Sequence, residues 1–263
     1  MAESRDPYSV PLDEFIDKVQ PHRVMSRRSG EHWLGALYAR KVSPRISRFL
    51  IRANVSAMAT TYTMIAIGTL GAAVIAMPGV WSAVVAALAM QTYLVLDCCD
   101  GEIARWNGTE GAKGVYIDRA GHYLTEATAF VALGFRAQNA LEIGDWAYLG
   151  SVVALLAIFA KSESDLVGTS RASSGMSPIE DVEPTTATGL RSLRSRVLST
   201  GIHRILGAIE LTMLVIVAAL IDTAFGSLAA TRVLLVVTAV VAVTVVIGHF
   251  ISIVTSDRLT RNR

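Results

Sequence analysis

Long apolar stretches alternate with shorter polar ones from about residue 57 to about residue 255. A helix needs about 20 predominantly apolar residues to cross about 30 Å of hydrocarbon, so each stretch of nearly that length is a candidate crossing. Six such runs occur, at about 57–77, 79–98, 115–135, 145–162, 205–223 and 229–255. The pattern therefore predicts an all-α fold with six transmembrane helices.

The composition supports a membrane protein. Of the 263 residues, 52% are hydrophobic and only 17% are charged, which leaves little charged surface for a water-soluble body built from six apolar helices. The first 50 residues carry many charges and no continuous apolar core, so they do not fit a cleavable secretory signal. We expect an integral membrane protein with no nucleic-acid partner.

The basic residues predict an orientation in the membrane. If the N-terminus is cytoplasmic, 22 of the 24 Lys and Arg residues fall on the cytoplasmic side, and only Arg136 and Arg232 lie toward the other side. Basic residues resist translocation, so this asymmetry favours cytoplasmic N- and C-termini. The polar segment 97–114 then also lies in the cytoplasm, and the expected location is the plasma membrane.

Two regions are expected along the chain. Residues 1–32 are polar and without clear periodicity, which indicates a partly ordered cytoplasmic extension, and residues 33–263 form the membrane domain. A helix is predicted near 43–53, with Ser43 as its N-cap and Pro44 at its first position.

That helix is amphipathic. Its apolar face is formed by Ile46, Phe49 and Leu50, and its basic face by Arg45, Arg48 and Arg52. Such a helix before a crossing is typical of the membrane interface, where arginines pair with lipid phosphates. A plain basic anchor explains the same residues.

The strongest chemical signal lies at the end of the second apolar run and in the third. At about 100° per residue, one helix face within an arc of about 140° is formed by Asp97, Asp100, Gly101, Ala104 and Arg105. A second face, within about 100° on the next helix, is formed by Gly114, Asp118, Gly121 and His122. Ionisable groups at or within transmembrane helices are functional candidates.

These residue types suit the binding of a diphosphate through a divalent cation. Mg²⁺ and Mn²⁺ prefer oxygen ligands, and carboxylates commonly share such ions with phosphate oxygens. The alternative is an interhelical ion-pair network. Three acids against one nearby arginine leave an excess of negative charge, which favours a cation.

The same residues resemble a family signature. The pattern D-x2-D-G-x2-A-R-x8-G-x3-D-x3-D is that of the CDP-alcohol phosphotransferases, and seven of its eight positions match over residues 97–122. The resemblance implies transfer of a phospho-alcohol group, most simply a phosphatidyl group, from a CDP-linked lipid or alcohol donor to an acceptor hydroxyl. CMP is released, the reaction belongs to phospholipid biosynthesis, and the protein is expected to form a homodimer in the bilayer.

The resemblance also implies roles for the matching residues. Asp97, Asp100 and Asp118 would bind a pair of Mg²⁺ or Mn²⁺ ions that hold the CDP diphosphate. The CDP-binding residues would be Asp97, Gly101, Ala104, Arg105 and Gly114, with the small residues making space for cytidine and Arg105 at the nucleotide end.

The eighth position differs from the signature. The family has a fourth aspartate there, considered both a metal ligand and the catalytic base, and this chain has His122. A neutral imidazole can serve as a general base or a metal ligand. The alternative is a catalytically impaired protein that binds CDP-lipid without turnover. Glu126, one turn further, is a candidate for orienting the imidazole or a plain helical acid.

The acceptor is less well defined. Lys161 and Arg171 would suit an acceptor phosphate, although basic residues are expected beside a transmembrane helix in any case. A small transporter is a competing class, but it predicts acids scattered near mid-membrane rather than clustered at one edge.

Overall fold

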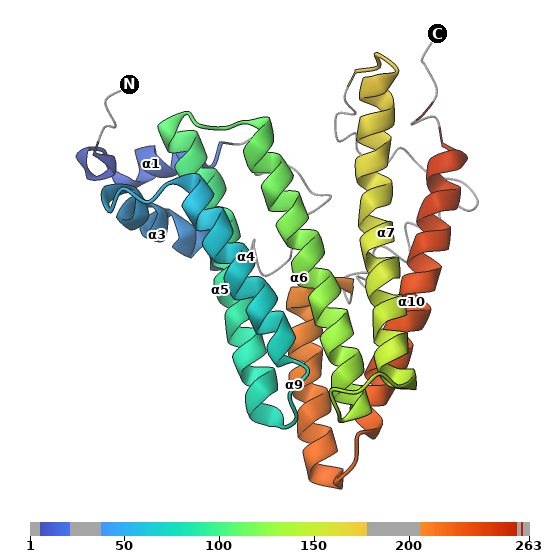
Figure 1. The fold of residues 1–263 in the computed structure, drawn as a ribbon. Helices are drawn as coiled ribbons and strands as arrows, with labels where there is room; N and C mark the ends of the chain where they lie inside the picture. Colours follow the sequence, from blue (N-terminus) through green and yellow to red (C-terminus); the bar gives the residue numbers. More distant parts are fainter. Residues whose placement is uncertain (1–5, 22–37, 178–205, 257–258, 260–263) are drawn as a thin grey trace. The chain divides into compact units, whose positions relative to one another are not determined.

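The computed structural model describes residues 6–21, 38–177, 206–256 and 259, and within these ranges it contains helices and no strands. The elements, drawn in Figure 1, are η1 (Pro7–Ser9), α1 (Leu12–Val19), α3 (Arg40–Arg52), α4 (Ala57–Val74), α5 (Val80–Asn107), α6 (Ala112–Gln138), α7 (Asp145–Ser173), α9 (Ala208–Phe225) and α10 (Ala229–Val254).

Each of the six predicted apolar runs forms a helix. Among the described residues, α4, α5, α9 and α10 are long and apolar enough to cross a membrane, which indicates a membrane protein. Helices α6 and α7 have 27 and 29 residues but are more polar. Both carry ionisable side chains along their length, so six crossings stay a prediction.

Helix α5 continues nine residues beyond the predicted end at 98. It ends where Gly108 adopts a left-handed conformation with φ of 63°. The amide of Thr109 then donates to the carbonyl of Ala104 at 2.9 Å, as in a glycine-terminated helix C-cap. The whole segment from Asp97 to Arg105 is therefore helical, as the argument from shared faces requires.

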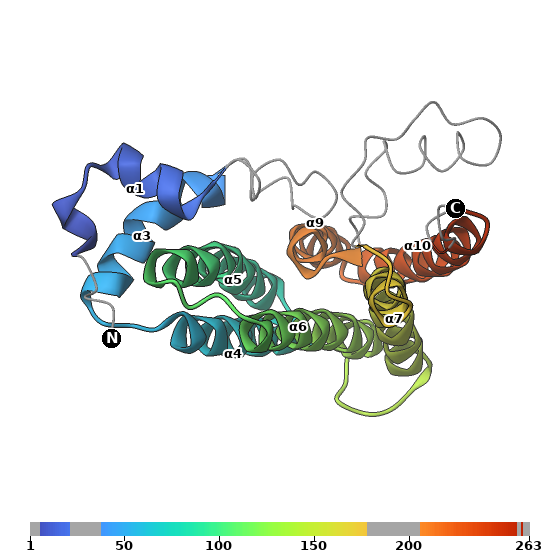
Figure 2. The ribbon, with the colours of Figure 1, turned by 90° about the horizontal axis from the view of Figure 1, so that it is seen from above.

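Helix α7 also extends past the predicted end of the fourth apolar run at 162 and continues to Ser173. The buried side chains of Glu163 and Val167 keep packing inside the protein, and Glu163 lies 3.1 Å from His249 of α10. Figure 2 shows α7 and α10 side by side. The polar residues did not end the helix because a neighbouring helix covers one of its sides. Residues 178–205 lie outside the described residues.

Helix α3 confirms a helix near 43–53 but corrects its start and its faces. It begins at Arg40, so Ser43 is not the N-cap and Pro44 lies inside the helix. Arg48 is only 9% exposed, and its guanidinium donates to the carbonyl of Val10 at 2.9 Å and lies over the ring of Tyr8. Arg48 is therefore not part of a solvent- or lipid-facing basic face.

The N-terminal extension contains a helix that was not predicted. In α1, Phe15 and Val19 lie one turn apart and are fully buried. They pack in one cluster with Ile51 of α3 and with Cys99, Ile103 and Trp106 of α5. Leu12, Phe15, Ile16 and Val19 have the i, i+3, i+4, i+7 spacing of an amphipathic helix, so the sequence carried a usable signal for α1. The α5 surface provides the place where this apolar face is buried.

The chain divides into two compact units. The first contains Met1–Gly71 and Leu88–Thr125, and the second contains Ala72–Ala87 and Glu126–Arg263. In the second unit the buried Arg136 donates to the carbonyl of Met77 at 2.8 Å and to that of Gly79 at 2.9 Å. This side chain fixes the connection between α4 and α5.

Candidate metal centre

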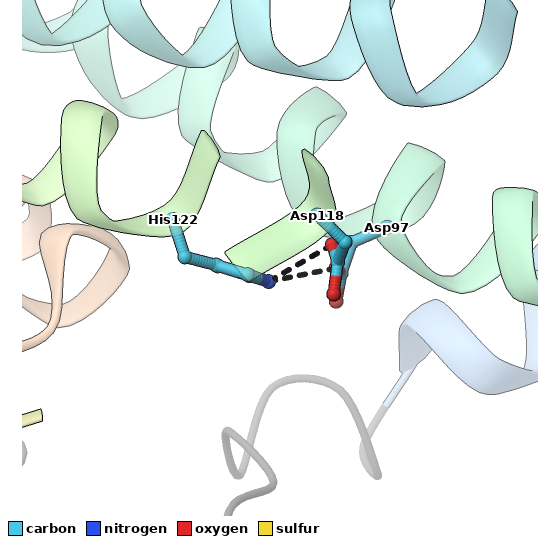
Figure 3. Close-up of side chains that lie close together, drawn as sticks. All are labelled: Asp97, Asp118 and His122. Carbon is cyan, nitrogen blue, oxygen red and sulfur yellow. Dashed lines mark hydrogen bonds and ion pairs between the residues drawn. The ribbon is translucent and has the colours of Figure 1, made fainter. Parts of the chain in front are cut away.

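Two helices of the first unit bring three predicted ligands together. Asp97 comes from α5, and Asp118 and His122 lie one turn apart on α6. The His122 Nε2 atom lies 3.1 Å from Asp97 Oδ1 and 3.4 Å from Asp118 Oδ1 (Figure 3). One ligand atom from each residue lies within 4.8 Å of the others, so one ion could contact all three.

Glycines in the first unit allow α4 to lie close to α5 and α6. A Cβ atom on Gly121 of α6 would lie 2.3 Å from the Ile65 side chain of α4. A Cβ atom on Gly68 of α4 would lie 2.5 Å from the ring of Tyr93 on α5. The separation of the helices that carry the site therefore depends on these two missing side chains.

The three residues fit a divalent metal ion. Asp118 Oδ1 is buried and accepts no hydrogen bond, although a buried carboxylate oxygen normally has a partner. A cation among the three side chains would supply that partner. The exposed fractions of 22% for His122, 28% for Asp97 and 35% for Asp118 leave the group open to a ligand.

Asp100 is not one of the three residues whose ligand atoms lie within 4.8 Å of one another. It is 9% exposed, and its Oδ2 atom accepts a hydrogen bond of 2.7 Å from the Thr61 hydroxyl of α4. That bond orients Oδ2, and Asp100 Oδ1 could still bind a metal ion. Its role as a metal ligand stays a prediction.

Among the residues predicted to hold the nucleotide, Gly101, Ala104 and Arg105 lie on the last two turns of α5, and Gly114 lies on the first turn of α6. The Arg105 Nε–H donates to the carbonyl of Val19, at the end of α1. Its guanidinium also fills the space beside Gly101, where a Cβ atom would lie 3.0 Å from it. Ala104 is half-buried, and no atom lies within 4 Å of a Cβ built on Gly114. The open space is thus at Gly114 rather than at Gly101.

The candidate acceptor residues belong to the second unit. Lys161 Nζ lies 2.5 Å from Glu126 Oε1, and the Arg171 guanidinium donates to the carbonyl of Ser177. Glu126 is therefore the partner of Lys161, which explains its burial. An acceptor phosphate at Lys161 and Arg171 stays a prediction.

Two residues of the site were not predicted from the sequence. Tyr93 Oη lies 2.5 Å from His122 Nδ1. Glu102 is fully buried and accepts hydrogen bonds from the side chains of Gln20 at 2.7 Å, Ser43 at 2.5 Å and Ser47 at 2.6 Å. Tyr93 lies one turn before Asp97 on the same helix, and this spacing was a usable signal for its role. Nothing in the sequence predicted the burial of Glu102, because its partners come from α3 and from the segment after α1.

The fold and this site define a helical membrane protein with a candidate metal centre. No protein-family model matches the chain, and no curated protein matches its sequence. The resemblance to the CDP-alcohol phosphotransferases therefore depends on the seven motif positions and on the site built from them.

Proposed function

We propose that this protein is a divalent-metal-dependent CDP-alcohol phosphotransferase that moves a phosphatidyl or related phospho-alcohol group onto an acceptor hydroxyl. The acceptor oxygen attacks the phosphorus that carries the alcohol. The new P–O bond forms as the anhydride bond to CMP breaks, and the hydroxyl proton passes to a base of the site.

The observation that carries the proposal is the convergence of Asp97, Asp118 and His122. Three motif positions from two helices place their ligand atoms within 4.8 Å, and one carboxylate oxygen has no hydrogen bond. The same oxygen lies 3.4 Å from His122 Nε2, so an ion pair within the group is the competing explanation of this contact. The convergence is expected if the motif binds a cation and is not required by helix packing.

Different residues of the site would bind the metal ions and the nucleotide. Asp97, Asp118 and His122 would hold a divalent ion, and Asp100, oriented by Thr61, would serve a second one. A bound Mg²⁺ or Mn²⁺ pair neutralises diphosphate charge during transfer. The open surface at Gly114 would admit the nucleotide. Arg105, tied to the end of α1, would close the nucleotide side.

The proposed setting is the plasma membrane. Six helices cross it, α3 lies at the interface, and both termini and the metal centre face the cytoplasm, where CDP-linked donors are available. A homodimer is part of this proposal. The partners are the CDP-activated donor, the hydroxyl acceptor and the bilayer.

The test is release of CMP from CDP-diacylglycerol by the purified protein in detergent, with Mn²⁺, with Mg²⁺ and with EDTA. We expect metal-dependent release that rises when a suitable acceptor is added. Glu142→Gln serves as a matched control, because Glu142 is an exposed acid outside the site.

Two results would contradict activity in different ways. CDP-lipid binding without CMP release, over a panel of polyol and phosphorylated acceptors, would support the catalytically impaired alternative. Absence of both binding and release would remove the family assignment.

A further inference from the structure

His122 is held at both of its ring nitrogens. On α5, Tyr93 and Asp97 lie one turn apart, and on α6, Asp118 and His122 do the same. The imidazole therefore has Tyr93 Oη at 2.5 Å from Nδ1 and the carboxylates of Asp97 and Asp118 beside Nε2.

The phenol is fixed in place by packing. Tyr93 is 3% exposed, and its ring meets the His122 ring edge-on, with centroids 5.5 Å apart. Gly68 of α4 makes the room for it, since a Cβ atom there would lie 2.5 Å from the ring. A buried tyrosine hydroxyl needs a hydrogen-bond partner, and His122 Nδ1 is one.

The position of the phenol decides which nitrogen can bind a metal. A neutral imidazole carries one proton, and an ion can bind Nε2 only when that proton is on Nδ1. Nδ1–H then needs an acceptor, and Tyr93 Oη lies at hydrogen-bond distance. A tyrosine hydroxyl can also donate a hydrogen bond. Without a metal ion it can donate to unprotonated Nδ1, and with an ion on Nε2 it can accept from Nδ1–H.

We propose that Tyr93 is a positioning residue that holds the Nδ1–H tautomer of His122 and so makes His122 a metal ligand through Nε2. The imidazole then makes this centre bind Mn²⁺ and Co²⁺ in preference to Mg²⁺, because Mg²⁺ favours oxygen ligands and first-row transition ions accept imidazole more readily. This inference rests on the metal centre of the proposed function, but its readout is metal binding rather than turnover.

The test is a double-mutant cycle on Mn²⁺ affinity, measured from the electron paramagnetic resonance signal of free Mn²⁺ over the purified protein in detergent. Tyr93→Phe keeps the ring and removes the hydroxyl, so we expect affinity to fall by about 10- to 100-fold, as for other outer partners of a ligand. Tyr62→Phe is the matched control, because Tyr62 is an exposed tyrosine on α4.

The second half of the cycle uses His122→Asp. A carboxylate at position 122 has no ring tautomer to fix, so Tyr93→Phe in that background should change Mn²⁺ affinity by less than about 3-fold, far below the loss expected beside His122. An equal loss in both backgrounds would show that the hydroxyl only supports packing and would overturn the proposal.

Ion selectivity is measured by displacing Mn²⁺ with Mg²⁺. We expect His122→Asp to lower the Mg²⁺ concentration needed for displacement by at least about 10-fold, since the change restores an oxygen ligand. A parent protein that binds Mg²⁺ as tightly as Mn²⁺ contradicts the selectivity.

A measurement on the unchanged sequence does not depend on the variants folding. Nitrogen-15 NMR of labelled histidine, assigned with His122→Asp, should show His122 as the Nδ1–H tautomer once Zn²⁺ is added. An Nε2–H tautomer with metal bound, or no metal binding at all, overturns the proposal. Metal binding as expected without CMP release leaves it standing and rejects the enzymatic function instead.

Discussion

At the scale of single residues, the carboxylates of the motif give the most direct prediction. We expect Asp97→Asn, Asp100→Asn and Asp118→Asn each to abolish metal-dependent CMP release, because an amide keeps the shape but not the charge that a hard cation needs. Radiometric CMP release from membranes with matched protein levels is the measurement, with Glu142→Gln as the control. More than a tenth of the activity remaining in all three, a loss below about 1.4 kcal/mol, would remove the metal from the mechanism.

His122 gives a prediction about pH. A protonated Nε2 has no lone pair for a metal ion. Mn²⁺ affinity and CMP release should therefore both fall when the pH is low enough to protonate the imidazole. A carboxylate is protonated at a lower pH than an imidazole, so His122→Asp should move the acidic limb to lower pH. The measurement is Mn²⁺ affinity against pH for both proteins, and coincident acidic limbs would show that His122 is not a ligand.

At the scale of helices, Gly68 connects packing to the metal centre. A methyl group at this position would lie 2.5 Å from the Tyr93 ring and 2.9 Å from Thr125 Oγ1, so Gly68→Ala must displace the tyrosine that holds His122. We expect Mn²⁺ affinity to fall about 10-fold or more, as on loss of an outer partner. The control is Gly248→Ala on α10, where no atom lies within 4 Å of the added methyl. Equal affinity in the two variants would show that α4 does not determine the position of Tyr93.

Glu102 joins the N-terminal region to α5. Replacing it with alanine leaves the donors of Gln20, Ser43 and Ser47 without their buried acceptor, at a cost of about 3 kcal/mol. We expect the melting temperature in detergent to fall by about 6–12 °C, with a change in tryptophan fluorescence because Trp106 packs against Phe15.

The control for this change is Glu110→Gln, because Glu110 is an exposed acid just beyond α5. If Glu102→Ala melts at the same temperature as the control, the hydrogen bonds to Glu102 do not hold the N-terminal region in place.

At the scale of the whole molecule, the proposed topology places the α5–α6 connection in the cytoplasm. We choose Thr109→Cys for labelling because it is exposed, whereas Gly108 has a positive φ that disfavours other residues. With Cys98 and Cys99 changed to alanine, a membrane-impermeant maleimide should react with Thr109→Cys only after the cytoplasmic face is opened. Leu141→Cys, in the exposed α6–α7 connection, should react in intact cells. The reverse pattern would overturn the orientation.

The positions of the long helices and part of the site could be predicted from sequence because they depend on local regularities. Apolar runs of about 20 residues identify transmembrane helices, and a period of 3.6 residues places Asp118 and His122 on one face. The prediction that they converge with Asp97 agrees with the structure. The composition also sufficed for the membrane class, since four described helices have the required length and apolarity.

Tertiary structure decided which polar side chains meet between elements distant in sequence. Glu102 is buried because α3 and the segment after α1 supply its hydrogen-bond donors, and α1 is helical where α5 covers its apolar side. Asp100 shares a helix face with Asp97, yet it accepts a hydrogen bond from Thr61 of α4 and is not one of the three grouped ligands. The contact of Tyr93 with His122 depends on how closely α4, α5 and α6 approach one another. A sequence determines helical faces through local periodicity, but the partners across those faces depend on helix separation and rotation, which only the packed structure defines.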